Sequence, residues 1–433
     1  MDRILIFGAG KSATILIKYL GKTCAASGWQ LAVFDNDLSL LQSKTRDYNT
    51  VKIIQGDVAD TEARKNAIDD ADLVISMLPP QLHIHVAHDC LEYSKHLLTA
   101  SYVDDSLRKL EKEIENKALL FLCEMGLDPG IDHMSAMKML KEIADEGGSV
   151  TSFKSHCGGL VAPESDTNPW HYKITWNPMN VVMGGAAGAI FKKDGVTNSV
   201  SYQEVFSNCE TVNVPSLPLL AAYPNRDSLS YIKTYGLEHV QTFVRTTLRY
   251  PAFCNGWNRI VNYGLTDTDD QIQIGNAGTY REWFHAKTGI QDISTLEADK
   301  EFYEQASYLG LLQREKLQAS FTNSAQILKH LLETRLKLEP DDRDMIVMQH
   351  EIEYTLEKYK KRKVSSLVVK GDDNSHTAMA KTVGLPLGIA AVMILSEKIT
   401  ERGLRIPVSP QIYKPVLNEL EKQGIKFHET YLE

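Results

Sequence analysis

A glycine-rich turn near the start of the chain constrains its fold more than any other feature. The stretch RILIFGAGKSATILIKYL, residues 3–20, places an apolar run before the turn and apolar residues at helical spacing after it. This order predicts a strand, a tight turn and a helix. Gly8 permits the turn, Gly10 allows a pyrophosphate to approach the backbone, and Ala13 lets the helix lie close to the sheet. The sequence therefore predicts a dinucleotide-binding unit with the phosphates at the helix N-terminus.

The strands that follow supply the other cofactor contacts that we expect. The run QLAVFD ends at Asp35, at the distance from the glycines where a carboxylate holds a ribose 2′-hydroxyl. VKIIQGDVAD and ADLVISMLPP contain two further buried runs, whose ends fall where a doubly wound sheet lines its adenine and nicotinamide grooves. The alternative is the same fold without a cofactor, and the intact fingerprint argues against it. The predicted cofactor-binding residues in this region are Gly8, Gly10, Lys11, Ser12, Ala13, Asp35, Asp57, Val58, Leu78 and Pro79.

Composition and charge narrow the class of partner. With 433 residues, 43% hydrophobic and 24% charged, the chain is long enough for two or three cores. A formal charge of −9 and a pI near 5.8 argue against a nucleic-acid or membrane-surface binder, because both need a basic footprint. We therefore expect a small-molecule partner, with no nucleic acid and no membrane.

The cysteines and the N-terminus indicate the compartment. The six cysteines are scattered without a CxxC pair, so they signal neither a metal site nor a disulfide framework. The first residues, MDRILIFGAG, enter a strand at once and leave no room for a signal peptide. We expect no later apolar run to reach the length of a membrane span. Together these features predict a soluble, cytoplasmic protein with reduced thiols.

The pattern of elements changes beyond about residue 128. Turn-rich strands such as SVTSFKSHCGGL alternate with irregular stretches, which predicts a mixed α+β domain packed against the first. Amphipathic spacing between about 291 and 340 predicts a small helical subdomain. Strand alternation returns in RDMIVMQHEIEYTLE and KVSSLVVKGD, and HTAMAKTVGLPLGIAAVMILSEKI predicts a long apolar helix that must be buried. The stretch 157–176, CGGLVAPESDTNPWHYKITW, has neither strand alternation nor helical spacing and predicts a shaped loop surface.

Several motifs together resemble those of saccharopine reductases, the saccharopine dehydrogenases that form glutamate. TASYV, GLDPGIDH, CGGLVAPE, YPNRD and TAMAKTVGLP occur in this order over nearly the whole chain. The resemblance implies an α/β protein whose N-terminal Rossmann domain is followed by a mixed α+β substrate domain with a small helical insertion. The expected bounds are 1–128 for the Rossmann domain, 129–290 and 341–380 for the substrate domain, 291–340 for the insertion, and 381–433 for a C-terminal segment that returns to the nucleotide domain.

The reaction implied by the resemblance joins glutamate to aminoadipate semialdehyde as an imine and reduces it to saccharopine, or runs in reverse. Saccharopine carries three carboxylates and a secondary amine, so its site needs fixed cations and a proton path. Arg226 and Arg245 are the expected cations, because a guanidinium grips a carboxylate through two hydrogen bonds. Arg249 is a weaker candidate and would share a strand face with Arg245. The ordinary alternative for an arginine is a surface ion pair.

The same resemblance implies the proton relay and the rest of the pocket. Asp128, Ser101 and Tyr102 are the candidates for the proton relay. Cys157 is a further catalytic candidate beside Asp128 and Tyr102, and an inert buried thiol is the alternative for it. Trp176 would wall the pocket or pack in the core, and His133 would cap or pack a helix rather than act as a base. The predicted substrate-binding residues are Ser101, Tyr102, Asp128, Cys157, Gly158, Gly159, Trp176, Arg226, Arg245, Thr246 and Thr247, and Ser101 is also predicted to contact the cofactor.

Two positions depart from the better-known fungal members of the family. Those members have the sequence CGGLPAPE in this loop, and Val161 stands here in place of its proline. Asp35 stands where members that use NADP tend to carry an arginine or a small polar residue, and an acid there repels a 2′-phosphate. The residue therefore favours NAD, whereas the resemblance implies NADP.

Other functions stay open at this point. Carboxynorspermidine dehydrogenase is another imine reductase of the same fold. A lysine 6-dehydrogenase would not need two arginines for several carboxylates. A regulator that senses NAD without turnover is the alternative from a different class. The sequence does not fix the oligomeric state, and a homodimer is among the states that it allows.

Overall fold

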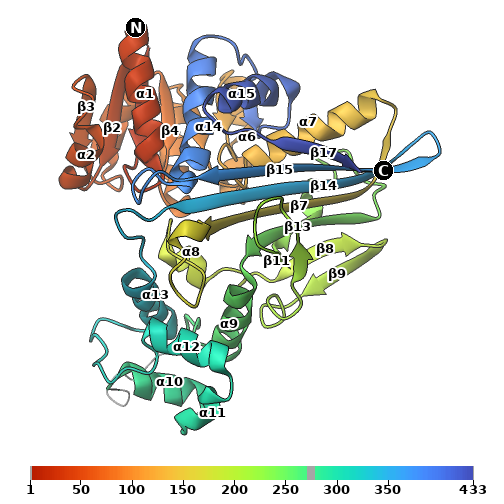
Figure 1. Ribbon diagram of the computed structural model, residues 1–433. Helices are drawn as coiled ribbons and strands as arrows, with labels where there is room; N and C mark the ends of the chain where they lie inside the picture. Colours follow the sequence, from red (N-terminus) through yellow and green to blue (C-terminus); the bar gives the residue numbers. More distant parts are fainter. Residues whose placement is uncertain (1, 271–277, 433) are drawn as a thin grey trace. The chain divides into compact units, whose positions relative to one another are not determined.

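The computed structural model describes residues 2–270 and 278–432. Its internal contacts divide the chain into two units. The first unit comprises Met1–Gly147 and Ser375–Phe427, and the second comprises Gly148–Asn374 and His428–Glu433. Figure 1 follows the chain through both units by colour.

A parallel sheet forms the centre of the first unit. Its central strands β1 and β4 are short runs of mostly apolar, buried residues, as in strands that are covered on both faces. The strand order is β16-β6-β5-β4-β1-β2-β3, which contains the order of a dinucleotide-binding sheet. The strands are β1 (Arg3–Phe7), β2 (Gln30–Asp35), β3 (Val51–Gln55), β4 (Leu73–Ser76), β5 (His96–Thr99), β6 (Leu120–Leu122) and β16 (Gly403–Arg405).

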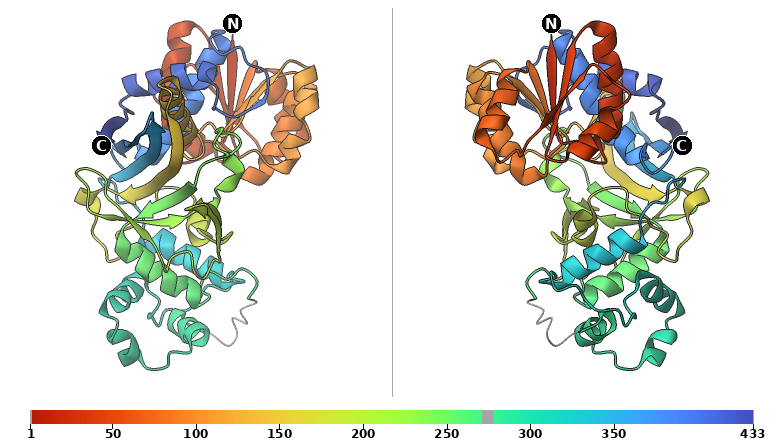
Figure 2. Two further views of the ribbon diagram at one scale, coloured as in Figure 1. Left: turned by 90° about the vertical axis from the view of Figure 1, so that its right-hand side faces the viewer. Right: turned by 90° about the vertical axis from the view of Figure 1, so that its left-hand side faces the viewer.

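Helices cover both faces of this sheet, as the two views of Figure 2 show. The sequence sets their ends: Asp60 caps α3 by accepting hydrogen bonds from Glu62 N and Ala63 N, and Gly28 ends α1 in the left-handed conformation. The fold class that we expected for this unit is confirmed. The helices are α1 (Ala13–Ser27), α2 (Leu38–Thr45), α3 (Thr61–Asp69), α4 (His83–Glu92), α5 (Asp105–Arg108), α6 (Glu111–Asn116), α7 (Ile131–Asp145), α14 (Ala378–Leu395) and α15 (Pro410–Lys422).

Helix α14 is the long apolar helix that the sequence indicates. By length and composition alone it could cross a membrane, which differs from our expectation that no apolar run would be long enough. Most of its residues are buried in the first unit, where it packs against α1, β4 and β5. A buried core helix explains this composition.

A mixed sheet forms the centre of the second unit. Its long strands β7 and β13 run parallel, and β14 pairs antiparallel with β7 on the other side. The main order is β10-β11-β13-β7-β14-β15-β17, and β8, β9 and β12 pair to one side. The strands are β7 (Ser149–Val161), β8 (Ala189–Lys193), β9 (Val196–Val200), β10 (Glu210–Val212), β11 (Leu220–Pro224), β12 (Arg226–Asp227), β13 (Thr242–Arg249), β14 (Asp344–Leu356), β15 (Tyr359–Lys370) and β17 (His428–Leu432).

A helical subdomain belongs to the second unit and lies below its sheet in Figure 1. Its core is aromatic: Trp170, Trp257 and Trp283 are almost fully buried there. Trp170 comes from the irregular stretch after β7, and its indole N–H donates to Gln305 O at 2.9 Å. The helices are α8 (Pro178–Val182), α9 (Pro251–Asn262), α10 (Tyr280–Thr288), α11 (Ile293–Glu297), α12 (Lys300–Leu309) and α13 (Ser324–Arg335).

The structural units differ from the domain bounds that we expected. Helix α7 packs against α15, so the first unit extends to Gly147 rather than to residue 128. Helix α9 (Pro251–Asn262) already belongs to the helical subdomain, ahead of the bound near residue 291 that we expected, because its apolar face is part of the aromatic core. Cys157–Val161 form the end of β7 rather than a loop. The C-terminal segment belongs to the first unit as far as Phe427, whereas the strand that follows, β17, joins β15 in the second unit.

Candidate active site

The glycine turn of the first unit lies between β1 and α1. Gly8 has φ +95°, and a Cβ there would lie 3.1 Å from Met77 O, so both conformation and space require glycine. A Cβ on Gly10 would meet nothing within 4 Å. The turn therefore leaves room beside the backbone of Gly10 for a ligand group, and the buried Ala13 starts the helix behind it.

Asp35 at the end of β2 braces this turn. Its Oδ2 accepts from Ala9 N at 2.7 Å, and its Oδ1 accepts from Asp37 N at 3.0 Å. An ionised carboxylate has roughly four acceptor positions, so it can accept from a ribose hydroxyl as well. Asp35 thus has a structural contact that the sequence did not indicate, beside the site where a cofactor role is predicted.

The remaining cofactor candidates lie along one edge of the sheet. The parallel register places the carboxyl ends of β1 to β5 together, with Phe7 paired to Ser76 and Ser76 paired to Thr99. Ligands of doubly wound sheets bind outside this edge. The residues that directly follow these strands, or begin α1, include the predicted Lys11, Ser12, Asp57, Val58, Leu78, Pro79 and Ser101.

The catalytic candidates of the first unit meet at the same edge. Tyr102 Oη donates to Asp128 Oδ1 over 3.5 Å, and both residues are half-buried. Tyr102 follows β5, whereas Asp128 lies in the loop between β6 and α7. The fold thus brings together two side chains that are 26 residues apart in the sequence.

A buried polar network holds the loop that carries Asp128. Glu124 accepts from Val103 N at 3.1 Å, and its other oxygen lies 2.9 Å from His133 Nε2. Gly130 has φ +146°, and a Cβ there would lie 2.1 Å from Gly126 O. His133 is fully buried in the first turn of α7, so its position agrees with a packing role.

A second polar network, which sequence reasoning missed, surrounds His83 at the start of α4. The imidazole is 3% exposed, and its two nitrogens lie within hydrogen-bonding distance of Ser76 and Ser101. Burial lowers the pKa of His83 to about 4. The sequence signal was a histidine shortly after a strand end and two prolines, but its partner Ser101 is 18 residues away in the chain.

One face of β13 carries the polar candidates of the second unit. Strand alternation puts Arg245, Thr247 and Arg249 on the same face, as we expected for the two arginines. Thr247 pairs with Cys157 of β7 on one side and with Tyr223 of β11 on the other. Burial raises the pKa of Tyr223 to about 12, so its phenol keeps its proton and can donate to an anion.

Arg249 is a buried charged residue on this face of β13. It is 7% exposed, and its Nη1 donates to Leu248 O at 2.8 Å and to Gly159 O at 3.3 Å. The guanidinium lies over the rings of Tyr172 and Phe253, at 5.2 Å and 5.5 Å. Within residues 2–270 and 278–432, Arg249 forms no ion pair with an acid, and its Nε is buried without an acceptor. A buried cation of this kind suits an anionic ligand.

The other two arginines differ in environment. Arg245 is 5% exposed, and its guanidinium lies 4.6 Å from the centre of the Tyr231 ring. Arg226 is exposed, in the short strand β12 with φ +52°. Sequence reasoning ranked Arg226 above Arg249, whereas burial favours Arg249.

Several of the predicted substrate contacts have structural partners in the second unit. Thr246 lies on the opposite face of β13 from Thr247, and its hydroxyl lies 2.7 Å from His156 Nδ1. A Cβ on Gly158 would lie 2.3 Å from Leu248 O, so close strand packing accounts for this glycine. Trp176 is half-buried and packs against the aromatic core of the helical subdomain. Cys157 is buried at 6% exposure, and Gly159 contributes its carbonyl to Arg249.

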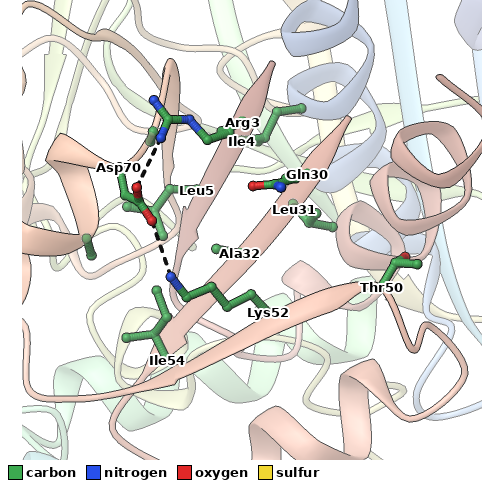
Figure 3. A pocket seen from close by; sticks show the side chains of 12 residues that line it. Arg3, Ile4, Leu5, Gln30, Leu31, Ala32, Thr50, Lys52, Ile54 and Asp70 are labelled. Carbon is green, nitrogen blue, oxygen red and sulfur yellow. Dashed lines mark hydrogen bonds and ion pairs between the residues drawn. The ribbon is translucent and has the colours of Figure 1, made fainter. Parts of the chain in front are cut away.

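A cavity of about 230 Å³ in the first unit lies away from the predicted cofactor edge. It is lined by the amino-terminal halves of β1 and β2, by residues of β3, and by residues at and just after the end of α3. Figure 3 shows Asp70 at its rim, bonded to Arg3 at 3.0 Å and to Lys52 at 3.2 Å. These exposed ion pairs and the opposite strand ends give no reason to place the dinucleotide here. In the part of the chain that the structure describes, no three acidic, cysteine or histidine side chains gather as a metal site.

Two models of saccharopine dehydrogenase domains together match nearly the whole chain. The model of the saccharopine dehydrogenase NADP binding domain matches residues 4–122, and that of the saccharopine dehydrogenase C-terminal domain matches residues 126–425. The mitochondrial alpha-aminoadipic semialdehyde synthase of Rattus norvegicus is 33% identical over 98% of this chain and 47% of its own length. The chain thus spans about half the length of the curated relatives that it matches first.

Two further relatives match from end to end. The saccharopine dehydrogenase (NADP(+), L-glutamate-forming) of Schizosaccharomyces pombe is 29% identical, with 100% of both chains covered. The solved apo saccharopine dehydrogenase (L-Glu forming) of Saccharomyces cerevisiae superposes with a TM-score of 0.91 at 29% identity, again over 100% of both chains.

Proposed function

The chain belongs to the saccharopine dehydrogenase family, and from this premise we propose that it interconverts saccharopine with glutamate and aminoadipate semialdehyde, using a nicotinamide dinucleotide. The observation that supports this best is the pair of buried guanidinium groups on one face of β13, Arg245 and Arg249. Saccharopine offers three carboxylates to such groups, whereas an amine-rich substrate would meet like charge there.

The glycine turn and Asp35 are the residues that would hold the dinucleotide. The open space beside Gly10 and the free N–H groups at the start of α1 fit a pyrophosphate. Asp35 Oδ1 and Oδ2 would accept from the adenosine ribose. When bound, the dinucleotide supplies the acceptor for the hydride that leaves saccharopine.

Asp128 and Tyr102 would handle the proton of the substrate amine. The carbon beside the saccharopine amine can give up its hydride only when that amine is neutral, because the nitrogen lone pair forms the C=N bond, so a base must first take one proton from the amine. Asp128 Oδ1 would hold that proton, and Tyr102 Oη, which donates to the same oxygen, would orient the carboxylate. Hydride transfer needs no nucleophile, so Cys157 would act by packing rather than by covalent catalysis.

The face of β13 would bind the carboxylates. Arg249 presents N–H donors within an aromatic and apolar surround, where a charge-assisted hydrogen bond is stronger than in water. The Thr247 hydroxyl and the protonated phenol of Tyr223 would complete the donor set.

A direct assay tests this function. The purified protein is incubated with saccharopine and NAD or NADP, reduced nicotinamide is followed by absorbance, and glutamate is measured as the product. We expect turnover of saccharopine and none of carboxynorspermidine. Turnover of carboxynorspermidine alone would support the other imine reductase, and dinucleotide binding without any turnover would support a regulator.

We propose NAD as the preferred cofactor, because Asp35 places a negative charge where NADP carries its 2′-phosphate. Asp35→Asn should shift the ratio of the two dissociation constants toward NADP by about ten-fold, since asparagine can still accept from Ala9 N but carries no charge. Fluorescence titration with both dinucleotides measures the ratio. Asp47→Asn removes an exposed acid beyond α2 and is the matched control. A wild-type preference for NADP would overturn this proposal.

A further inference from the structure

The His83 network joins two strand ends through one buried imidazole. Nδ1 lies 2.8 Å from Ser76 Oγ, and Nε2 lies 2.7 Å from Ser101 Oγ and 3.3 Å from Thr99 Oγ1. Ser76 and Thr99 are almost fully buried, whereas Ser101 is half-buried. The network therefore connects the interior of the first unit to a side chain at its surface.

The His83 network lies at the carboxyl ends of two neighbouring strands, β4 and β5. Ser76 ends β4, Thr99 ends β5, and the two residues are paired neighbours in the sheet. In a doubly wound sheet, the half that begins with β4 holds the nicotinamide mononucleotide beyond its carboxyl edge. Ser101 is thus the outward end of a hydrogen-bonded chain at the reacting end of the proposed cofactor site.

A neutral imidazole limits the Ser101 hydroxyl to two orientations, one for each tautomer of the ring. Burial lowers the pKa of His83 to about 4, against the opposing charge of Asp104, so the ring has one donor and one acceptor nitrogen near pH 7. If Nε2 accepts, the hydroxyl donates inward and offers its lone pairs to a ligand. If Nε2 donates, the hydroxyl proton points outward. In both tautomers the hydrogen bond to the imidazole fixes the orientation of the Ser101 hydroxyl, which would otherwise rotate freely.

We propose that His83 is a positioning residue that orients the Ser101 hydroxyl toward the nicotinamide and the substrate amine, with Ser76 and Thr99 fixing the ring. The proposal rests on the dehydrogenase function proposed above, and it adds a residue that acts through another side chain. A neutral His83 can do this throughout the range above its pKa of about 4. Protonation would make both ring nitrogens donors and force the hydroxyl proton outward.

Paired variants test the link between His83 and Ser101. His83→Asn keeps a polar group near Nδ1 but loses contact with Ser101, whereas His83→Gln can reach the place of Nε2. We expect kcat for saccharopine to fall by about ten-fold in His83→Asn and by less in His83→Gln, with a smaller change in KM. His83→Asn combined with Ser101→Ala should equal Ser101→Ala alone. His85→Asn, on the exposed side of the same helix, is the control.

Two outcomes would overturn the proposal. The first is an additive loss in the double variant, because His83 would then act independently of Ser101. The second comes from the wild-type protein, where dinucleotide addition should shift the ring-nitrogen NMR resonances of His83; unchanged resonances on saturation would contradict the proposal even if the variants do not fold. Failure of the wild type to oxidise saccharopine would instead count against the proposed function.

Discussion

Replacing Arg249 by methionine is expected to lower kcat/KM for saccharopine by about a hundred-fold, on the order of 3 kcal/mol, while the unliganded protein keeps or gains stability. The guanidinium is buried, donates only to two backbone carbonyls, and pairs with no acid within residues 2–270 and 278–432. A charge in this situation destabilises the empty protein, and methionine fills similar space without it. Kinetics on saccharopine and a thermal or denaturant unfolding curve measure the two effects.

Matched variants separate a binding role from a structural one. Arg249→Lys keeps the charge but loses the planar fork, so it should recover only part of the affinity. Arg259→Met removes an arginine from the exposed side of α9, where it pairs with Asp299, and should leave kcat/KM unchanged. A loss of stability in Arg249→Met with normal saccharopine kinetics would show that Arg249 only supports the fold.

Gly10→Val is expected to weaken binding of either dinucleotide by more than about a hundred-fold, without unfolding the protein. A Cβ at this position would meet nothing within 4 Å, and the backbone of Gly10 does not have the positive φ of Gly8. The valine side chain would therefore occupy the space that the pyrophosphate needs, rather than disturb packing. Titration of nucleotide fluorescence gives the affinity, and circular dichroism reports the fold.

The control for this variant lies on α1, the helix that follows the turn. Lys22→Val adds a valine to the exposed side of α1, away from the turn, and should leave affinity unchanged. Unaltered dinucleotide binding in Gly10→Val would contradict the cofactor site. A variant that binds poorly because it is unfolded would be recognised by its spectrum.

The parts of the fold that sequence reasoning predicted are those with local signals. The glycine turn, the apolar strand runs and the helical spacing each depend on residues close together in the chain, and they predicted the parallel sheet of the first unit. The face shared by Arg245 and Arg249 follows from strand alternation alone. The same alternation places Thr246 and Thr247, both predicted to bind the substrate, on opposite faces of β13.

The parts that were missed depend on contacts between distant segments. His83 becomes a candidate only when Ser76 and Ser101 are brought beside it, and Ser101 is 18 residues away. The importance of Arg249 lies in its burial and in the absence of an acid partner among the described residues, which no spacing indicates. The extent of the first unit depends on the packing of α7 against α15, which lie far apart in the sequence.

The division of each unit into separate chain segments has a consequence for synthesis of the protein. Helix α14, which packs against α1, β4 and β5, lies in the segment that follows residues 148–374 of the other unit. On the ribosome, β4 and β5 are therefore synthesised long before α14. Until α14 is made, the apolar face that it will cover is exposed to water or to chaperones. Translation of the dinucleotide-binding unit begins before that of the second unit. Its core can nevertheless be completed only after nearly the whole second unit has been translated.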